Sequence, residues 1–155
     1  MPITPSFVAL ALLACSDAEV AVEEAPKVAK KRTAVGDADV TAVFAREESD
    51  GTWTFHVTVQ HNDRDWSDFA DGWDVVLPDG TAVRPDPFYA FTKQIRNPHV
   101  DEQPFTRTQR NIEIPSDVNT VRVRAHDKAG GFGGQEVEVD LNVRFGPNYS
   151  VKRAL

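Results

Sequence analysis

The sequence has little of several features that mark common classes of protein. It contains a single cysteine in 155 residues, so no disulfide can form within the chain. Its apolar run at residues 7–14 is far shorter than the ~20 residues that a transmembrane helix needs. Bases are outnumbered, since 17 Lys and Arg face 24 Asp and Glu and leave a net charge of −7. That balance argues against nucleic-acid binding through a basic surface.

Recognisable catalytic motifs are absent as well. There is no Gly-x-Ser-x-Gly sequence, and the glycine-rich stretch at residues 130–134 lacks the Lys-Ser/Thr that would complete a phosphate-binding loop. Many Asp and four His are present, but none lies in a known catalytic arrangement. We therefore expect a protein that is not an enzyme.

The lone cysteine directly follows the apolar run. A run of this length is typical of the central region of a signal peptide. The ending Leu12-Leu13-Ala14-Cys15 resembles the bacterial lipobox, in which the cysteine becomes the first mature residue and carries the lipid. The resemblance implies a signal peptide over residues 1–14 and a lipid anchor on Cys15. Ser16 would be the second mature residue, and a serine there resembles the sequence of lipoproteins sent to the outer membrane. We therefore expect a protein that is lipid-anchored to the outer membrane and faces the periplasm.

The segment before the apolar run departs from this pattern. Residues 1–6 contain no Lys or Arg, whereas a signal peptide normally starts with basic residues. Two alternatives therefore stay open, namely ordinary secretion and an apolar N-terminal part of the fold with an incidental cysteine.

A tether follows the cysteine. Residues 15–36 are mainly Ala, Val, Glu and Lys and contain no large apolar side chain, so they cannot build a core. From Asp37 onward, apolar and polar residues alternate in short runs, which is the period of a half-buried strand. The expected strands are residues 38–44, 53–59, 73–77, 81–83, 88–95, 105–114, 121–125 and 137–145.

Seven to eight short strands without an amphipathic helix predict an all-β protein. We expect one antiparallel β-sandwich over residues 37–146, followed by a tail at residues 147–155. The stretch from Val121 to Leu141 resembles the closing hairpin of immunoglobulin-like and fibronectin type III domains. The Cys–Trp–Cys framework of antibody domains is missing, so the resemblance is one of architecture.

Three further stretches carry a narrower resemblance. Residues 66–76, 98–107 and 130–134 are similar to a largely uncharacterised family of small exported bacterial proteins, over about residues 38–141. The resemblance implies a domain type and a location in the cell envelope. It implies no activity.

An Asp-rich loop is the first candidate metal site. Asp63, Asp65 and Asp68 offer the oxygen ligands that Ca²⁺ prefers, but the glycine and closing Glu of a calcium loop are missing. The alternative is turn chemistry, because Asp side chains cap turns by accepting backbone N–H groups.

The histidines form a second candidate. His61, His99 and His126, with Glu102, have the ligand chemistry of a copper or zinc site. Their spacing matches no closed zinc motif, and solvent-facing histidines on strands are the alternative.

Partner binding is the third candidate, and we favour it. His99, Glu102 and Arg107 lie in a polar segment that suits a recognition loop or, alternatively, a structural crossover with Glu102 paired to a base. Trp66 and Phe132 are aromatic side chains of the kind that anchor a protein or stack on a sugar. The sequence thus predicts a non-catalytic envelope lipoprotein that binds a protein or glycan, with a periplasmic metal-binding module as the alternative.

Overall fold

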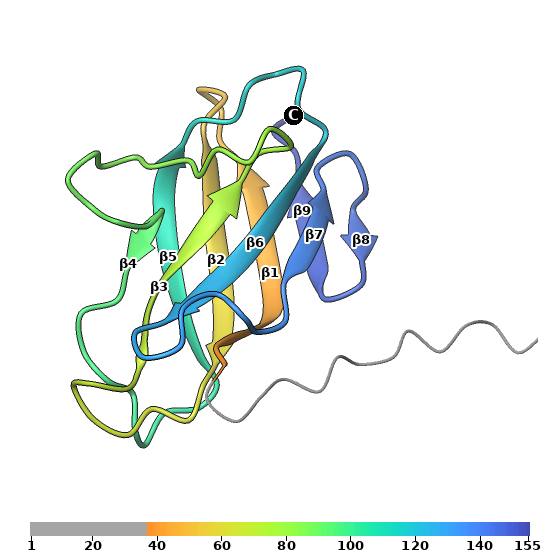
Figure 1. Ribbon diagram of the computed structural model, residues 1–155. Helices are drawn as coiled ribbons and strands as arrows, with labels where there is room; N and C mark the ends of the chain where they lie inside the picture. The colour runs from red at the N-terminus through yellow and green to blue at the C-terminus, as the bar shows by residue number, and fades with distance from the viewer. Residues whose placement is uncertain (1–36) are drawn as a thin grey trace, which may run out of the picture. The chain divides into compact units, whose positions relative to one another are not determined.

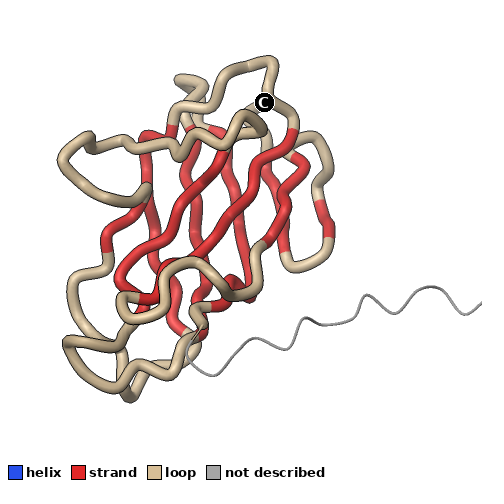
Figure 2. The backbone as a smooth tube through the Cα atoms, in the orientation of Figure 1, coloured by secondary structure: helices blue, strands red, loops and turns tan. Residues whose placement is uncertain are grey.

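The computed structural model describes residues 37–155, so Cys15 and the predicted signal peptide and linker lie outside the described residues. The described part forms nine strands and no helix (Figures 1 and 2). None of it therefore forms a helix able to cross a membrane. The strands are β1 (Asp39–Glu47), β2 (Trp53–Gln60), β3 (Ala70–Val76), β4 (Lys93–Gln94), β5 (Phe105–Ile112), β6 (Thr120–Asp127), β7 (Val137–Asp140), β8 (Phe145–Gly146) and β9 (Tyr149–Lys152).

The strands make two sheets that face each other across one apolar core. The first has the order β5-β2-β1-β9-β8 and the second the order β4-β3-β6-β7. Every pairing is antiparallel except that of β1 with β9. The all-β prediction is confirmed, and the two layers match a β-sandwich (Figure 1).

The alternating runs explain why these segments form strands. In β2, Phe55, Val57 and Val59 are fully buried at every second position. Across the core, Trp73 of β3 and Val123 of β6 are fully buried as well. Burying a side chain of this size contributes about 1.5–3 kcal/mol, so the pattern fixes which face of each strand turns inward.

Three expected strands are much shorter in the structure. Of residues 137–145, β7 takes only Val137–Asp140, because Asp140 accepts the N–H of Asn142 in a turn. Residues 81–83 contribute only the isolated bridge between Val76 and Ala82. Of residues 88–95, only Lys93 and Gln94 pair with a neighbour, against β3. Pro85 and Pro87 precede that segment and have no N–H group to donate to a ladder, which accounts for the long loop.

The end of the chain also differs from expectation. The tail predicted from residue 147 contains β9, which pairs with β1 and buries Val151. The folded domain therefore extends to Lys152. This strand was not predicted because four residues show too few alternations to reveal a period of two.

The candidate residues gather at one end of the sandwich. β2 ends there at Gln60 and β6 ends there at Asp127, while β3 and β5 begin there. The pairings of Val59 with Phe105 and of Ala70 with Asp127 place these strand ends next to each other within each sheet. This is the lower end in Figure 1.

Candidate metal centre

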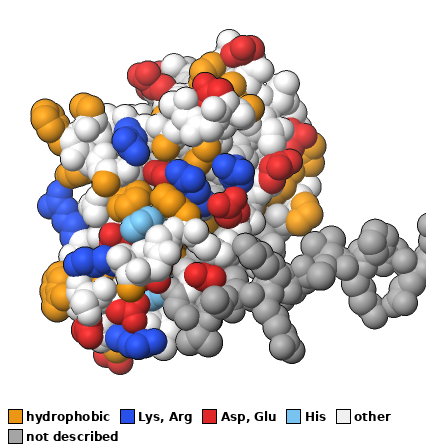
Figure 3. Space-filling view, viewed as in Figure 1, with side chains coloured by type: hydrophobic (Ala, Val, Ile, Leu, Met, Phe, Trp, Pro, Cys, Tyr) orange, Lys and Arg blue, Asp and Glu red, His pale blue; other side chains and the backbone are white. Residues whose placement is uncertain are grey.

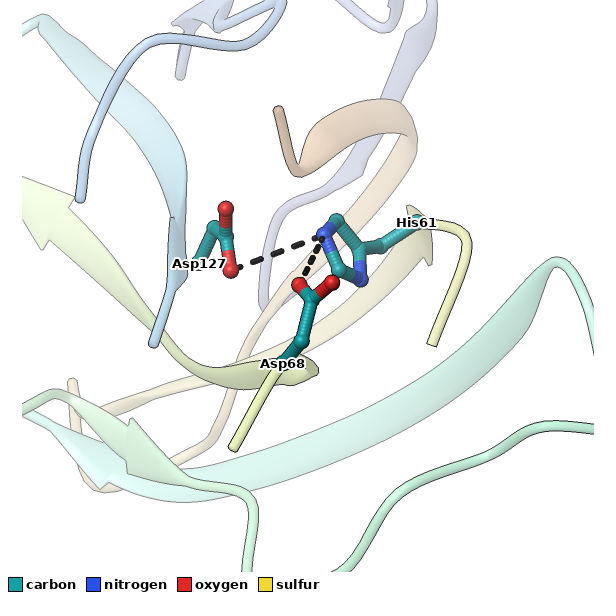
Figure 4. Close-up of side chains that lie close together, drawn as sticks. All are labelled: His61, Asp68 and Asp127. Carbon is teal, nitrogen blue, oxygen red and sulfur yellow. Dashed lines mark ion pairs between the residues drawn. The ribbon is translucent and has the colours of Figure 1, made fainter. Parts of the chain in front are cut away.

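Two side chains from the loop between β2 and β3 and one from the end of β6 converge on one point. The Nε2 atom of His61 lies 3.6 Å from Oδ1 of Asp127 and 3.8 Å from Oδ1 of Asp68. One ligand atom from each of the three residues lies within 4.8 Å of the other two. Figure 4 shows both carboxylates turned toward the same ring nitrogen.

The three residues come from both sheets. His61 directly follows β2 of the first sheet, whereas Asp68 precedes β3 and Asp127 ends β6 in the second. Anything bound between them would hold the two sheets together at this end. The side chains of His61 and Asp127 are 0% and 4% exposed, and that of Asp68 is 18% exposed.

A fourth residue, Asp63, orients the imidazole from behind. Its Oδ1 lies 2.7 Å from Nδ1 of His61, and both side chains are completely buried. A carboxylate at that distance accepts the Nδ1–H and fixes the orientation of the ring, which turns Nε2 toward Asp68 and Asp127 (Figure 4). A carboxylate behind a histidine is the usual outer partner of a metal ligand.

Asp63 is itself held by backbone donors. Its Oδ1 accepts the N–H of Ala70 at 3.1 Å, and its Oδ2 accepts the N–H of His99 at 2.6 Å. Both oxygens are thus used by protein donors, and Asp63 serves to position His61.

The glycine-rich loop positions Asp127. Oδ1 of Asp127 accepts the N–H of Ala129 at 2.9 Å, and the backbones of Asp127 and Gly131 exchange two hydrogen bonds. Gly131 has a φ of +80°, which favours glycine. A Cβ atom on the neighbouring Gly130 would lie 2.7 Å from Oδ2 of Asp127, so a larger residue there would displace that carboxylate.

The ligand atoms are spaced more widely than atoms that share direct hydrogen bonds. Separations of 3.6 and 3.8 Å exceed the ~3.2 Å limit of a good N–H···O bond. Around a tetrahedral ion with bonds of ~2.0–2.2 Å, neighbouring ligand atoms lie ~3.3–3.6 Å apart, and the two distances from His61 are close to that range. The two carboxylate oxygens lie within 4.8 Å of each other and would approach on binding an ion. Two carboxylates also balance the charge of a divalent ion.

The types of ligand atom limit which metal ion could bind. One imidazole and two carboxylates suit Zn²⁺ and related divalent transition metals, whereas Ca²⁺ prefers six to eight oxygen ligands. The calcium loop predicted from Asp63, Asp65 and Asp68 does not assemble as one ligand set. Asp65 instead accepts the N–H and the hydroxyl of Ser67, as a turn cap does.

The predicted sharing of one metal among His99, Glu102 and His126 does not match the arrangement. Within residues 37–155, the one group of potential ligands within reach of each other is His61, Asp68 and Asp127. His126 pairs through Nδ1 with Asp71 at 2.6 Å. His61 and Asp68 belong to the predicted metal set, whereas Asp127 was missed.

His99 and Arg107 form a second, adjoining cluster. Arg107 Nη2 donates to Nε2 of His99, and the His99 ring stacks on Phe105 with centroids 4.1 Å apart. Burial, together with the Arg107 guanidinium, lowers the pKa of His99, although Asp63 and Glu102 act in the opposite direction. A neutral His99 that accepts from Arg107 carries its proton on Nδ1.

Of the predicted partner-binding residues, the structure brings three together. Glu102 lies 3.4 Å from Arg107 Nη2, so the pairing expected for a structural crossover is present next to His99. Trp66 is exposed and contacts Phe69, and Phe132 lies under the guanidinium of Arg124 at 3.8 Å. These two aromatic side chains therefore have separate surroundings.

The chain is similar to a protein of Halomicrobium mukohataei described as "Putative lipoprotein". The two are 31% identical over 104 residues, which cover 67% of this chain and 47% of the relative. The chain thus spans about half the length of that protein. No family model and no solved structure matches the chain. The similarity supports the lipoprotein prediction and leaves the immunoglobulin-like class as a prediction.

Proposed function

We propose that this chain is a lipid-anchored envelope protein whose β-sandwich binds one divalent transition-metal ion through His61, Asp68 and Asp127. The observation that carries the proposal is the convergence of these three ligand atoms in front of a buried carboxylate–histidine pair. Zn²⁺ fits the donor set best, with a water molecule or a further ligand completing four-coordination.

The anchor would be a lipid on Cys15. It is supported by the lipobox-like ending at Cys15 and by the similarity to a lipoprotein. Ser16 favours the outer membrane, facing the periplasm. The sandwich would belong to the immunoglobulin or fibronectin type III type, which the two-layer topology supports.

A binding role, rather than catalysis, is supported by the burial of the site. With His61 and Asp127 almost fully enclosed, an ion there would meet solvent mainly past Asp68. Because the ligands come from both sheets, the ion would stabilise the sandwich. Partner binding, our first prediction from the sequence, would involve the adjoining cluster of His99 and Arg107.

Metal uptake by the purified protein tests the proposal directly. The full chain, purified without a His tag and stripped with EDTA, is expected to take up one Zn²⁺ per molecule in isothermal titration calorimetry. Asp68→Asn and His61→Gln should each abolish tight uptake. His126→Gln, which removes a histidine outside the cluster, should leave uptake unchanged.

Circular dichroism would show whether each variant folds. Asp68→Asn is the more informative variant, because Asp68 is the least buried of the three side chains and its replacement disturbs the fold least. Stoichiometric uptake by both Asp68→Asn and His61→Gln, or no uptake by the native chain, would overturn the proposed function.

A further inference from the structure

The edge strand β5 carries polar side chains on its core-facing side. Arg107 pairs across the ladder with Val57, and Gln109 pairs with Phe55. Both partners on β2 are fully buried. Because paired residues on antiparallel strands project to the same face, Arg107 and Gln109 point between the two sheets. Such positions normally hold apolar residues, and departures from that pattern concentrate at functional sites.

A pocket lies where these side chains point. The facing edge strand β4 has only two residues and closes this side of the sandwich only partly. The pocket has a volume of about 390 Å³, within the ~300–1,000 Å³ typical of small-molecule sites. Its lining includes Lys93, Arg96 and Arg107 and contains no carboxylate. Figure 3 shows Lys and Arg side chains on the edge of the sandwich where β4 lies.

Two of the cations are held in place by neutral groups. Arg107 Nη2 donates to His99, and its Nη1 donates to the Thr106 carbonyl at 2.8 Å. Arg96 Nη2 donates to the Tyr89 hydroxyl at 2.6 Å. These contacts orient the guanidinium groups but do not neutralise them.

The acid that faces Arg107 is weakly engaged. Glu102 Oε2 lies 3.4 Å from Arg107 Nη2, and the Glu102 side chain is 61% exposed. Exposed ion pairs of this kind contribute little and exchange readily with solvent. A ligand carboxylate could therefore replace Glu102 at the guanidinium.

We propose that this pocket binds a carboxylate-bearing sugar, the uronic acid unit of an acidic glycan. A guanidinium pairs with a carboxylate through two parallel hydrogen bonds, and Lys93 adds charge. The amides of Asn97 and Gln109 and the Tyr89 hydroxyl offer partners for sugar hydroxyls.

Titration with D-glucuronate tests the proposal. We expect saturable chemical-shift changes in the ¹H–¹⁵N spectrum of the full chain at residues 93–97 and 107–109, and none with D-glucose. Arg107→Gln should weaken glucuronate binding about tenfold or more. Arg96→Gln, at an exposed position, should weaken it as well. Arg110→Gln is the matched control, because Arg110 is an exposed residue on the same strand that does not line the pocket.

Three outcomes would overturn the proposal. The first is no saturable response to glucuronate, and the second is equal binding of glucose. The third is tighter binding of inorganic phosphate, which would make the pocket a general oxyanion site. If Arg107→Gln aggregates while the native chain binds no glucuronate, the inward charge serves to protect an edge strand instead. Zinc uptake should be unchanged in Arg107→Gln, so this proposal and the metal site can fail separately.

Discussion

The substitution Asp68→Asn distinguishes a metal site from a cluster of ion pairs. The two interpretations predict opposite changes in the stability of the metal-free protein. In a metal site without its ion, the carboxylates of Asp68 and Asp127 repel each other within 4.8 Å. At an effective dielectric constant of about 20, that repulsion is at least ~3 kcal/mol. Solvent near Asp68 and the pairing of its Oδ2 with Arg64 at 3.1 Å reduce this to ~1 kcal/mol or less. The metal-free variant should therefore match or slightly exceed the native chain in free energy of unfolding.

Zinc should reverse that order. An ion at 100 times its dissociation constant stabilises the folded native chain by ~2.7 kcal/mol, since the unfolded chain lacks the site. For a domain of about 120 residues this corresponds to a rise of ~10 °C in Tm. Asp68→Asn should lose most of that rise. Thermal unfolding followed by circular dichroism, in EDTA and in excess Zn²⁺, measures all four states.

Asp65→Asn is the matched control for this experiment. Asp65 lies in the same loop, but its carboxylate caps Ser67 outside the cluster, so the full zinc response should remain. The reasoning is refuted if Asp68→Asn loses 1 kcal/mol or more in EDTA while the native chain shows no zinc response. That result would mean that direct contacts among the three side chains, and not an ion, hold the cluster together.

Three further predictions test neighbouring parts of the structure. Gly130→Ala should displace the Asp127 carboxylate, which its Cβ would approach to 2.7 Å, and should weaken zinc affinity about tenfold in calorimetry while the fold is kept. His99→Gln should flatten the pH dependence of stability in urea denaturation. Burial lowers the pKa of His99 in the folded state, so the unfolded chain binds the proton more readily. The native chain therefore loses stability as pH falls below the ordinary histidine pKa of 6.5. An equally steep loss of stability in the variant would contradict this. Val151→Asp should lower the free energy of unfolding by 2 kcal/mol or more, because it buries a charge between β9 and the core, and a loss below 0.5 kcal/mol would mean that β9 is dispensable.

The regular parts of the fold were predictable because their periodicity is local. Phe55, Val57 and Val59 alternate with polar residues over one unbroken strand, so β2 is evident from the sequence. Lys93 and Gln94 carry no such signal, since their pairing with β3 depends on a loop that returns from 17 or more positions away. The same holds for β9, whose partner β1 lies about 100 positions earlier.

The candidate site was only half visible for a related reason. His61 and Asp68 lie close in sequence in a loop rich in ligand atoms, so both were candidates. Asp127 lies 59 positions beyond Asp68 and reads as the last polar residue of an alternating strand. Only the pairing of Ala70 with Asp127 brings it to the same end of the sandwich. A ligand set drawn from two sheets cannot be inferred from spacing, because the register between distant strands is not encoded locally.

The buried groups at this end of the sandwich explain why Asp63 matters most to the arrangement. Its carboxylate is fully enclosed, which is costly unless hydrogen bonds replace the lost water. The N–H groups of Ala70 and His99 supply two of those bonds, and His61 Nδ1 supplies the third. His99 therefore connects the two clusters. Its backbone N–H binds Asp63, which orients His61, and its ring accepts a hydrogen bond from Arg107. Because one buried carboxylate contacts both neighbours, the proposed metal site and the proposed anion pocket share a frame, while their ligands are separate side chains that can be removed one at a time.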